Sequence, residues 1–138
     1  MSVRHAGPHD VLAIALLLGE LGYPVEPAAL ARRIERLPET TTVFVADTGE
    51  VVGLAALDVR PGLQSDAPSA RLVAFVVRED ARGRGIARAL LGAVEAAARE
   101  AGCEHLHVTA ANRRTDAHAA YRALGFSDTG VRFGKDLG

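Results

Sequence analysis

The sequence predicts an α/β fold, with a central mixed, mostly antiparallel sheet and helices on both of its faces. Three observations lead to this prediction. Short β-rich runs joined by turn residues fill much of the first half of the chain, and a long amphipathic helical pattern starts after Gly85. Behind that helix, strand and helix patterns alternate, which is typical of a mixed sheet. The length of 138 residues fits a single domain, residues 1–138, that can bury a core of its own.

Two helices are expected on the N-terminal side of the sheet. Asp10 can cap the first of them, which stops at Gly19 or Gly22 because glycine is favoured just beyond a helix C-terminus. One side of this helix is predicted to carry Leu12, Leu16 and Leu17. A second, short helix fits Pro27–Leu37.

A hairpin and a further strand follow. Thr42–Ala46 and Val51–Leu57 are β-rich runs joined by Asp47-Thr48-Gly49-Glu50, a combination that indicates a hairpin. Residues 60–69 carry two prolines and a glycine and are expected to form a loop. Arg71–Val77 is almost continuously apolar, which predicts a central strand covered on both faces.

The second half of the chain begins with the most regular helical pattern. Gly102 can end this helix, whose apolar stripe consists of Ile86, Leu90, Ala93, Val94 and Ala97. A strand is predicted around Leu106 and Val108, a short helix over Asp116–Leu124, and a last strand over Val131–Lys135. The helix over Asp116–Leu124 is expected to end at Gly125.

Composition and charge exclude several classes of function. The formal net charge of −1 and the aromatic content of 4% argue against a nucleic-acid-binding protein. The longest apolar run near the start, Val11–Leu18, is too short to span a bilayer, so no membrane association is expected and the chain is interpreted as cytoplasmic. A single cysteine, Cys103, excludes an internal disulfide, and no metal site is expected.

The stretch Arg82-Gly83-Arg84-Gly85-Ile86-Ala87 lies where the central strand passes into the long helix. Unpaired N–H groups at a helix N-terminus attract anions, and glycine lets a phosphate approach the backbone closely. Successive N–H groups from Gly83 to Arg88 are therefore predicted to surround a pyrophosphate, with arginines at the rim. The alternative is a tight turn whose arginines are simply solvated.

Two motifs at their expected separation resemble those of the GNAT superfamily of N-acetyltransferases. Arg82, Gly85 and Ala87 match the pattern Arg/Gln-x-x-Gly-x-Gly/Ala, and residues 121–126, Tyr-Arg-Ala-Leu-Gly-Phe, match Tyr-x-x-Leu-Gly-Phe. The resemblance covers nearly the whole chain. Residues 20–24 (Glu-Leu-Gly-Tyr-Pro) and 114–118 (Arg-Thr-Asp-Ala-His) are similar to runs of one subgroup, which includes aminoalkylphosphonate N-acetyltransferase, but they identify no substrate.

The resemblance implies an enzyme that moves an acetyl group from acetyl-CoA directly to a primary amine of a small molecule or peptide. It also implies that the fourth and fifth strands splay apart, so that the fourth strand presents backbone groups to the pantetheine arm while the turn holds the pyrophosphate. The residues expected to bind acetyl-CoA are Phe75, Val76, Val77, Arg82, Gly83, Arg84, Gly85, Ile86, Ala87, Arg88 and Arg114.

The same resemblance assigns the catalytic groups. Tyr121 is expected to act as general acid, and the backbone N–H of Val77 as donor to the oxyanion; a core tyrosine is the alternative for Tyr121. The strand Arg71–Val77 lacks the carboxylate that several relatives use as base. Candidates on the acceptor side are Glu20, Tyr23, Asp58, His107 and His118.

The missing strand carboxylate leaves a second hypothesis open. The chain would then be a catalytically idle CoA-binding regulatory module, which binds CoA without turnover. A homodimer is compatible with the superfamily but is not indicated by any residue pattern in this sequence.

Overall fold

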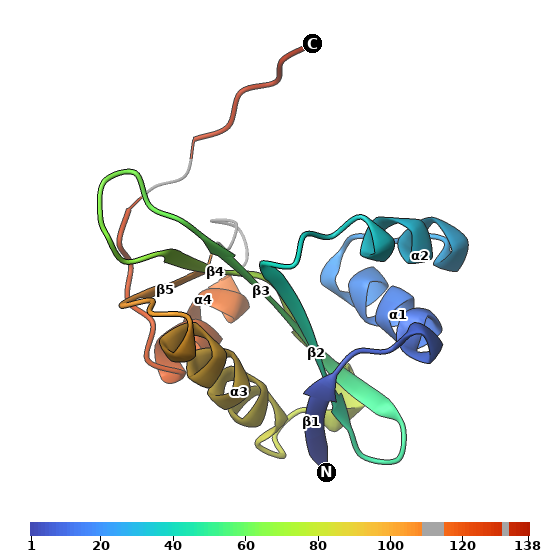
Figure 1. Ribbon diagram of the computed structural model, residues 1–138. Coiled ribbons are helices and arrows are strands. Elements are labelled where there is room, and N and C mark those ends of the chain that lie inside the picture. Colours follow the sequence, from blue (N-terminus) through green and yellow to red (C-terminus); the bar gives the residue numbers. More distant parts are fainter. Residues whose placement is uncertain (109–114, 131–132) are drawn as a thin grey trace. The chain divides into compact units, whose positions relative to one another are not determined.

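A computed structural model describes residues 1–108, 115–130 and 133–138 (Figure 1). The chain divides into two compact units, residues 1–107 and 108–138, which are described separately. Arg114, Val131 and Arg132, which carry predictions from the sequence, lie outside the described residues.

A five-stranded sheet forms the centre of the fold. Its strands are β1 (Ser2–His5), β2 (Thr41–Asp47), β3 (Val51–Arg60), β4 (Ser69–Val77) and β5 (Leu106–Val108), in the order β1-β2-β3-β4-β5. The first four are antiparallel to their neighbours. The predicted hairpin is confirmed as β2 and β3, and each strand is slightly longer than expected. Turn residues between two β-rich runs are a strong local signal for a hairpin.

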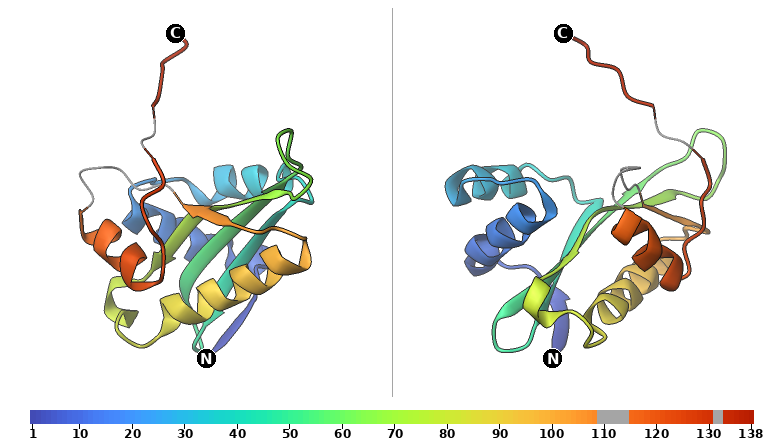
Figure 2. Two further views of the ribbon diagram at one scale, coloured as in Figure 1. Left: turned by 90° about the vertical axis from the view of Figure 1, so that its left-hand side faces the viewer. Right: turned by 180° about the vertical axis from the view of Figure 1, so that it is seen from behind.

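Helices cover both faces of the sheet in the first unit. The helical elements are η1 (Pro8–Asp10), α1 (Val11–Leu21), α2 (Pro27–Glu35), η2 (Glu79–Ala81), α3 (Ile86–Glu100) and, in the second unit, α4 (Thr115–Ala123). Figures 1 and 2 show α1 and α2 on one face and α3 on the other. The predicted α/β class is confirmed. Within the described ranges, no helix is both long and apolar enough to cross a membrane.

The strand that is buried on both faces is β3, not β4 as predicted. Every residue from Val52 to Asp58 is buried, because α1 packs on one face of β3 and α3 on the other. In β4, buried and exposed residues alternate at first, with Ala70 and Leu72 buried and Arg71 and Val73 exposed. A continuous apolar run therefore did not identify the most central strand.

The predicted apolar face of α1 is also wrong in part. Leu17 is buried with Ile14 and Ala15, whereas Leu12 and Leu16 are 63% and 67% exposed. The helix is apolar around most of its circumference, so the spacing of its leucines does not single out the face that meets the sheet. Its end at Gly22, which has φ of +106°, is as predicted.

Two other element boundaries differ from the predictions. The second helix ends at Glu35 instead of Leu37, because a residue before proline, here Leu37 before Pro38, avoids the α conformation. In the described part of the predicted last strand, Phe133 to Lys135, the backbone is not in a strand and Phe133 is 91% exposed. None of the described strands pairs with this segment, and an unpaired strand lacks the ladder hydrogen bonds that stabilise it.

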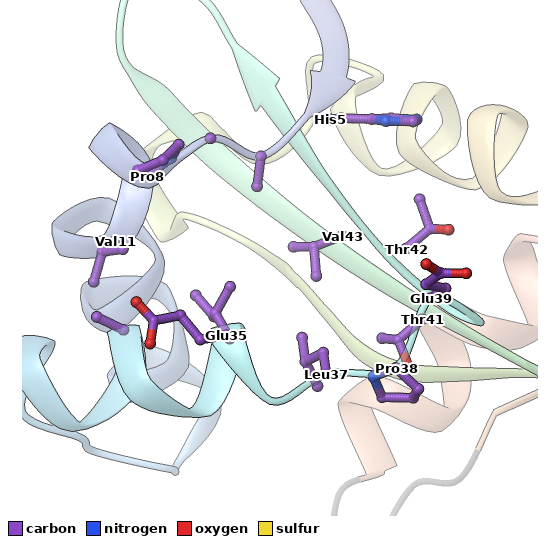
Figure 3. A pocket seen from close by; sticks show the side chains of 14 residues that line it. His5, Pro8, Val11, Glu35, Leu37, Pro38, Glu39, Thr41, Thr42 and Val43 are labelled. Atoms are coloured by element: carbon purple, nitrogen blue, oxygen red, sulfur yellow. The ribbon is translucent and has the colours of Figure 1, made fainter.

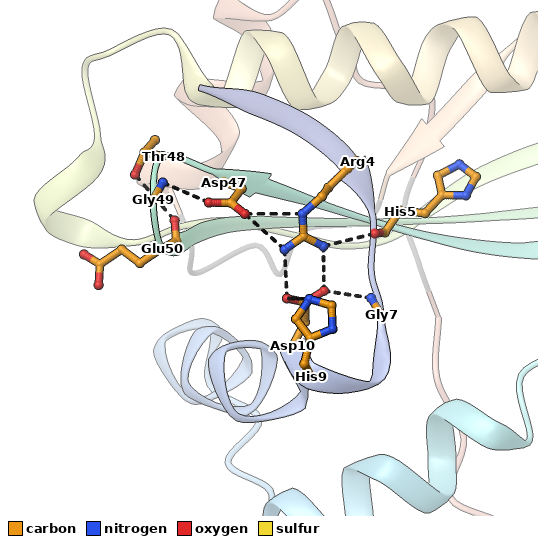
Figure 4. A network of polar contacts seen from close by, with 9 residues as sticks. All are labelled: Arg4, His5, Gly7, His9, Asp10, Asp47, Thr48, Gly49 and Glu50. Carbon is orange, nitrogen blue, oxygen red and sulfur yellow. Dashed lines mark hydrogen bonds and ion pairs between the residues drawn. The ribbon is translucent and has the colours of Figure 1, made fainter.

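An ion-pair network fixes β1, an element that the sequence did not reveal (Figure 4). Arg4 on β1 donates two hydrogen bonds to the carboxylate of Asp10, at 2.7 and 3.0 Å, and another at 3.1 Å to Asp47 on β2. Asp10 also accepts a hydrogen bond of 2.7 Å from the N–H of Gly7. Asp10 precedes α1 as predicted, but its side chain makes no capping bond to that helix; it ties β1 to the start of α1 instead.

The charge of Asp10 is expected to make stability depend on pH. Hydrogen bonds from Arg4, and a weaker contribution from Gly7, hold the pKa of this 3% exposed carboxyl at about 2, against a usual value of 3.8. Because the folded pKa is lowered, the stabilisation is complete above the usual value and is lost as pH falls toward 2. Such a shift corresponds to about 2 kcal/mol.

Asp10→Asn should therefore lower the free energy of unfolding by about 2 kcal/mol at neutral pH and have little effect near about pH 2. Urea unfolding across this range measures the difference, with the exposed Asp66→Asn as control. A constant difference between wild type and Asp10→Asn at all pH values would contradict this explanation.

Gly53 on β3 determines how closely α3 approaches the sheet. A Cβ atom at this position would lie 2.9 Å from Leu90 and 3.3 Å from Ile86, both in the first turns of α3, and 3.2 Å from Ala46. Glycine inside a strand often marks such a close approach. Gly53 therefore positions the N-terminal end of α3.

Gly53→Ala and Gly92→Ala should change stability in opposite directions. The first overpacks the contact with Leu90 and should cost about 1 to 3 kcal/mol. The second lies inside α3, where an added Cβ meets no atom within 4 Å, and should gain about 0.5 to 1 kcal/mol. Urea midpoints measure both changes, and a neutral Gly53→Ala would show that α3 can move away without cost.

Candidate functional site

The turn before α3 contains two glycines in the left-handed conformation. Gly83 and Gly85 both have φ of +79°, and Gly85 is the N-cap of α3. No heavy atom lies within 4 Å of a Cβ built on either glycine, so both face open space. Left-handed Gly83 and Gly85 thus alternate with Arg84, which has no positive φ. Such an alternating backbone can direct successive N–H groups into one concavity, where an anion can bind. The turn thus fits a pyrophosphate group.

Positive charge surrounds this turn. Arg84 and Arg88 are exposed, and neither forms an ion pair with any residue in the described ranges. Arg82 is different, because its Nε donates a hydrogen bond of 3.1 Å to the carbonyl oxygen of Val77 at the end of β4. Arg82 therefore links the turn to the strand, while Arg84 and Arg88 keep their charges available to an anion. The side chain of Ile86 is buried, so only its backbone faces the turn.

A further arginine, Arg78, holds the segment between β4 and the turn. The guanidinium of Arg78 binds Glu50 at 2.7 Å and Asp80 at 2.6 Å. The backbone N–H of Arg78 donates a hydrogen bond of 2.7 Å to the carbonyl oxygen of Val52. The hydrogen bonds from Arg78 lower the pKa of both carboxyls. This network was not predicted, because nothing local in the sequence connects Glu50 with Arg78.

The register of β3 and β4 shows which way the backbone of β4 points. In an antiparallel pair, opposite residues alternate between hydrogen-bonded and non-hydrogen-bonded pairs. The bond from Arg78 to Val52 makes that pair hydrogen-bonded, so Val77 opposite Gly53 and Phe75 opposite Ala55 are non-hydrogen-bonded. The backbone groups of Phe75 and Val77 consequently point away from β3. Those of Val76 point toward β3, and its side chain belongs to the core.

A β-bulge interrupts β4 before these residues. The register shifts between Ala56 and Leu57 of β3, where Ala74 and Leu72 are the partners and Val73 has no partner. Val73 is 52% exposed. Bulges bend a strand and are over-represented beside active sites. The sequence carries no signal for this bulge, because valine fits a regular strand equally well.

The second unit contains Tyr121, and its local structure explains the motif around it. The N–H of Gly125 donates to the carbonyl oxygen of Arg122 at 3.1 Å, and the N–H of Phe126 donates to the carbonyl oxygen of Tyr121 at 3.0 Å. These two bonds form a Schellman motif. Gly125 has φ of +98°, and the rings of Tyr121 and Phe126 are 5.7 Å apart, edge to face. The run Tyr-x-x-Leu-Gly-Phe thus ends α4 and fixes the ring of Tyr121 within this unit.

The candidates on the acceptor side have different surroundings. Glu20 accepts a hydrogen bond of 3.1 Å from the N–H of Glu79 and so connects the end of α1 to η2. Asp58 is buried and binds Arg60 at 2.8 Å and Thr41 at 3.3 Å. Both carboxylates therefore have structural partners.

The remaining candidates lie on separate parts of the chain. Tyr23 and His107 are exposed, and the ring of His107 is 6.4 Å from that of His105. His118 is half-buried on α4 in the second unit. Over the described residues, no group of three or more His, Cys, Asp or Glu side chains is placed to hold a metal ion.

Comparison with known proteins identifies the family. The model of the acetyltransferase (GNAT) family matches residues 12–126. An aminoglycoside N(6')-acetyltransferase type 1 of Stenotrophomonas maltophilia is 36% identical over 93% of this chain and 87% of that protein. An aminoalkylphosphonate N-acetyltransferase of Salmonella typhimurium is 30% identical over 98% of this chain and 90% of that protein.

The fold agrees with this assignment. The crystal structure of an aminoglycoside antibiotic 6'-N-acetyltransferase from Acinetobacter haemolyticus superimposes with a TM-score of 0.85 over the whole of both chains, at 20% identity. The chain belongs to the GNAT family of acetyltransferases. It is an N-acetyltransferase, a class of enzyme that transfers an acetyl group to an amine.

Proposed function

We propose that the protein uses acetyl-CoA as its acetyl donor and transfers the acetyl group directly to a primary amine of a small molecule or peptide. The observation that carries the proposal is the turn at Gly83–Arg88. Its two left-handed glycines face open space, and Arg84 and Arg88 form no hydrogen bond or ion pair through their side chains with any described residue. Such a turn suits a pyrophosphate group.

The residues of β4 and the turn take separate parts in holding the donor. The backbone groups of Phe75 and Val77 are assigned to the pantetheine arm, since the register turns them away from β3, toward the edge of β4 that is next to β5. N–H groups from Gly83 to Arg88 bind the pyrophosphate, and Arg84 and Arg88 add charge. Bound acetyl-CoA supplies the acetyl group as a thioester.

Two groups of the chain act on the reacting atoms. The N–H of Val77 donates a hydrogen bond to the oxygen on which negative charge develops. Tyr121 donates a proton to the leaving thiolate, because a tyrosine phenol is protonated at neutral pH. Glu20 and Asp58 already have structural partners, which argues against either as base. His107, His118 and a chain of water molecules remain as candidates for removing the proton of the amine.

The residues that are proposed to bind acetyl-CoA do not indicate which amine accepts the acetyl group. A primary amine with pKa near 10.4 is only about one part in 2,500 neutral at pH 7, so activity should rise with pH as the neutral fraction grows. The curated relatives are named for aminoglycosides and aminoalkylphosphonates. An acetyl-CoA consumption screen should therefore include both classes together with peptide N-termini. Binding of CoA without turnover of any amine would favour the idle CoA-binding module, which the lack of a carboxylate in β4 suggests.

Arg84→Glu should mainly weaken the binding of acetyl-CoA. Reversing a charge beside the pyrophosphate should raise the Kd for acetyl-CoA about tenfold or more, while kcat at saturation changes little. Calorimetric titration and steady-state kinetics measure the two effects, with the exposed Arg32→Glu on α2 as control. A lower kcat with an unchanged Kd would mean that Arg84 does not bind the donor.

A further inference from the structure

A surface cleft lies where α2 meets the end of β1 and the beginning of β2 (Figure 3). Its volume of about 590 Å³ is in the range of small-molecule sites. None of the residues that line it belongs to β4 or to the turn at Gly83–Arg88. The cleft is therefore separate from the proposed donor site, and the enzyme reaction assigns it no role.

The middle of the cleft is apolar. Val11, Ile34 and Val43 line it and pack with their other sides against the buried core of the first unit. Leu37, which is 42% exposed, extends this apolar lining toward solvent. A ligand with an aliphatic or aromatic middle would remove this surface from water.

The charges at the cleft are negative and lack partners. Figure 3 shows Glu35 and Glu39 on either side of Val43 and Leu37. Both glutamates are exposed, and neither forms a hydrogen bond or ion pair with any residue in the described ranges. The nearby charge of Asp10 is already neutralised by Arg4.

The arginines next to Glu35 do not line the cleft. Arg32, Arg33 and Arg36 are exposed and are absent from the lining of the cleft, to which α2 contributes Ala31, Ile34 and Glu35. A cation that enters the cleft therefore meets two carboxylates with no competing guanidinium on the cleft wall.

We propose that this cleft binds a small diamine, with one ammonium group at Glu35, the other at Glu39, and the connecting alkyl chain on Val43 and Leu37. Charge complementarity selects two cations, and the apolar middle selects the spacer between them. A monoamine would leave one carboxylate unpaired, and a diol would pair with neither. The site is independent of the proposed function, since its lining residues take no part in holding the donor.

Titration of the full chain with hexamethylenediamine, in the absence of acetyl-CoA, tests the proposal. We expect saturable binding that is about fivefold tighter than that of hexylamine, and no binding of hexanediol. Glu35→Gln and Glu39→Gln should each weaken diamine binding about fivefold, whereas Glu104→Gln, an exposed change outside the cleft, should not. Unchanged urea midpoints would show that the variants remain folded.

Amide signals in NMR locate the bound diamine. Shifts at Gly7 and Val43 support the proposal, and shifts confined to β4 and its following turn would overturn it. Equal affinities for the diamine and hexylamine, or Gln variants that bind like wild type, would also overturn it. Because no acetyl donor is present, failure of acetyl transfer leaves these outcomes unaffected, and failure of diamine binding leaves the proposed reaction standing.

Discussion

Gly85→Ala is expected to raise the KM for acetyl-CoA about tenfold to a hundredfold. The added methyl group would occupy the open space in front of the turn and push the left-handed backbone toward another conformation. Losing one or two hydrogen bonds from N–H groups to a charged phosphate costs about 1.5 to 3 kcal/mol each, which accounts for a change of this size. Steady-state kinetics with a varied donor measure it.

Gly49→Ala is the matched control for the turn variant. Gly49 lies in the β2–β3 hairpin, has φ of +108°, and likewise has no atom within 4 Å of an added Cβ. Both substitutions should therefore cost a similar free energy of unfolding through backbone strain, about 1 kcal/mol. Only Gly85→Ala should change the KM for acetyl-CoA. An equal effect of the two on KM would mean that strain, and not the loss of an anion site, is responsible.

Tyr121→Phe is expected to lower kcat by about a hundredfold or more, with little change in the KM for acetyl-CoA. The substitution removes only the hydroxyl group that is proposed to donate the proton. The ring remains, and with it the edge-to-face contact with Phe126 and the cap of α4. Single-turnover acetylation of a reactive amine measures the chemical step directly.

Phe126→Leu separates this chemical role from a structural one. It removes the ring contact with Tyr121 but leaves the hydroxyl group in place. If Tyr121 acts as general acid, Phe126→Leu should reduce kcat only a fewfold, about 1 kcal/mol at most for an aromatic pair. A loss as large as that of Tyr121→Phe, or full activity of Tyr121→Phe, would contradict the assignment and leave the core-tyrosine interpretation.

Local signals in the sequence predicted the elements around the turn at Gly83–Arg88 and the end of α4. The hairpin of β2 and β3, the helix α3 and the end of α4 at Gly125 all depend on turn residues, glycines and helical spacing within a few positions. The sequence also indicated a glycine turn at this place, and Gly83 and Gly85 both have left-handed angles. That the turn binds a pyrophosphate stays a prediction.

Features that depend on distant partners were missed or placed wrongly. The pattern of α1 is apolar on too many sides to show that Leu12 and Leu16 face solvent. β1 is short, and ion pairs of Arg4 with Asp10 and Asp47 hold it in place. The bulge at Val73 can be recognised only from the pairing of β4 with β3. The close approach of α3 to Gly53 is also a long-range contact, and a glycine inside the strand was the one sign of it in the sequence.

The most direct test compares CoA with pantetheine, which lacks the pyrophosphate and the 3′-phosphoadenosine attached to it, in calorimetric titrations of wild type and Gly85→Ala. If the turn at Gly83–Arg88 binds the pyrophosphate, wild type should bind CoA at least about tenfold more tightly than pantetheine, and Gly85→Ala should reduce this preference by weakening the binding of CoA alone. Pantetheine itself should bind both proteins equally. A substitution that weakened CoA and pantetheine by the same factor, or neither of them, would contradict the account.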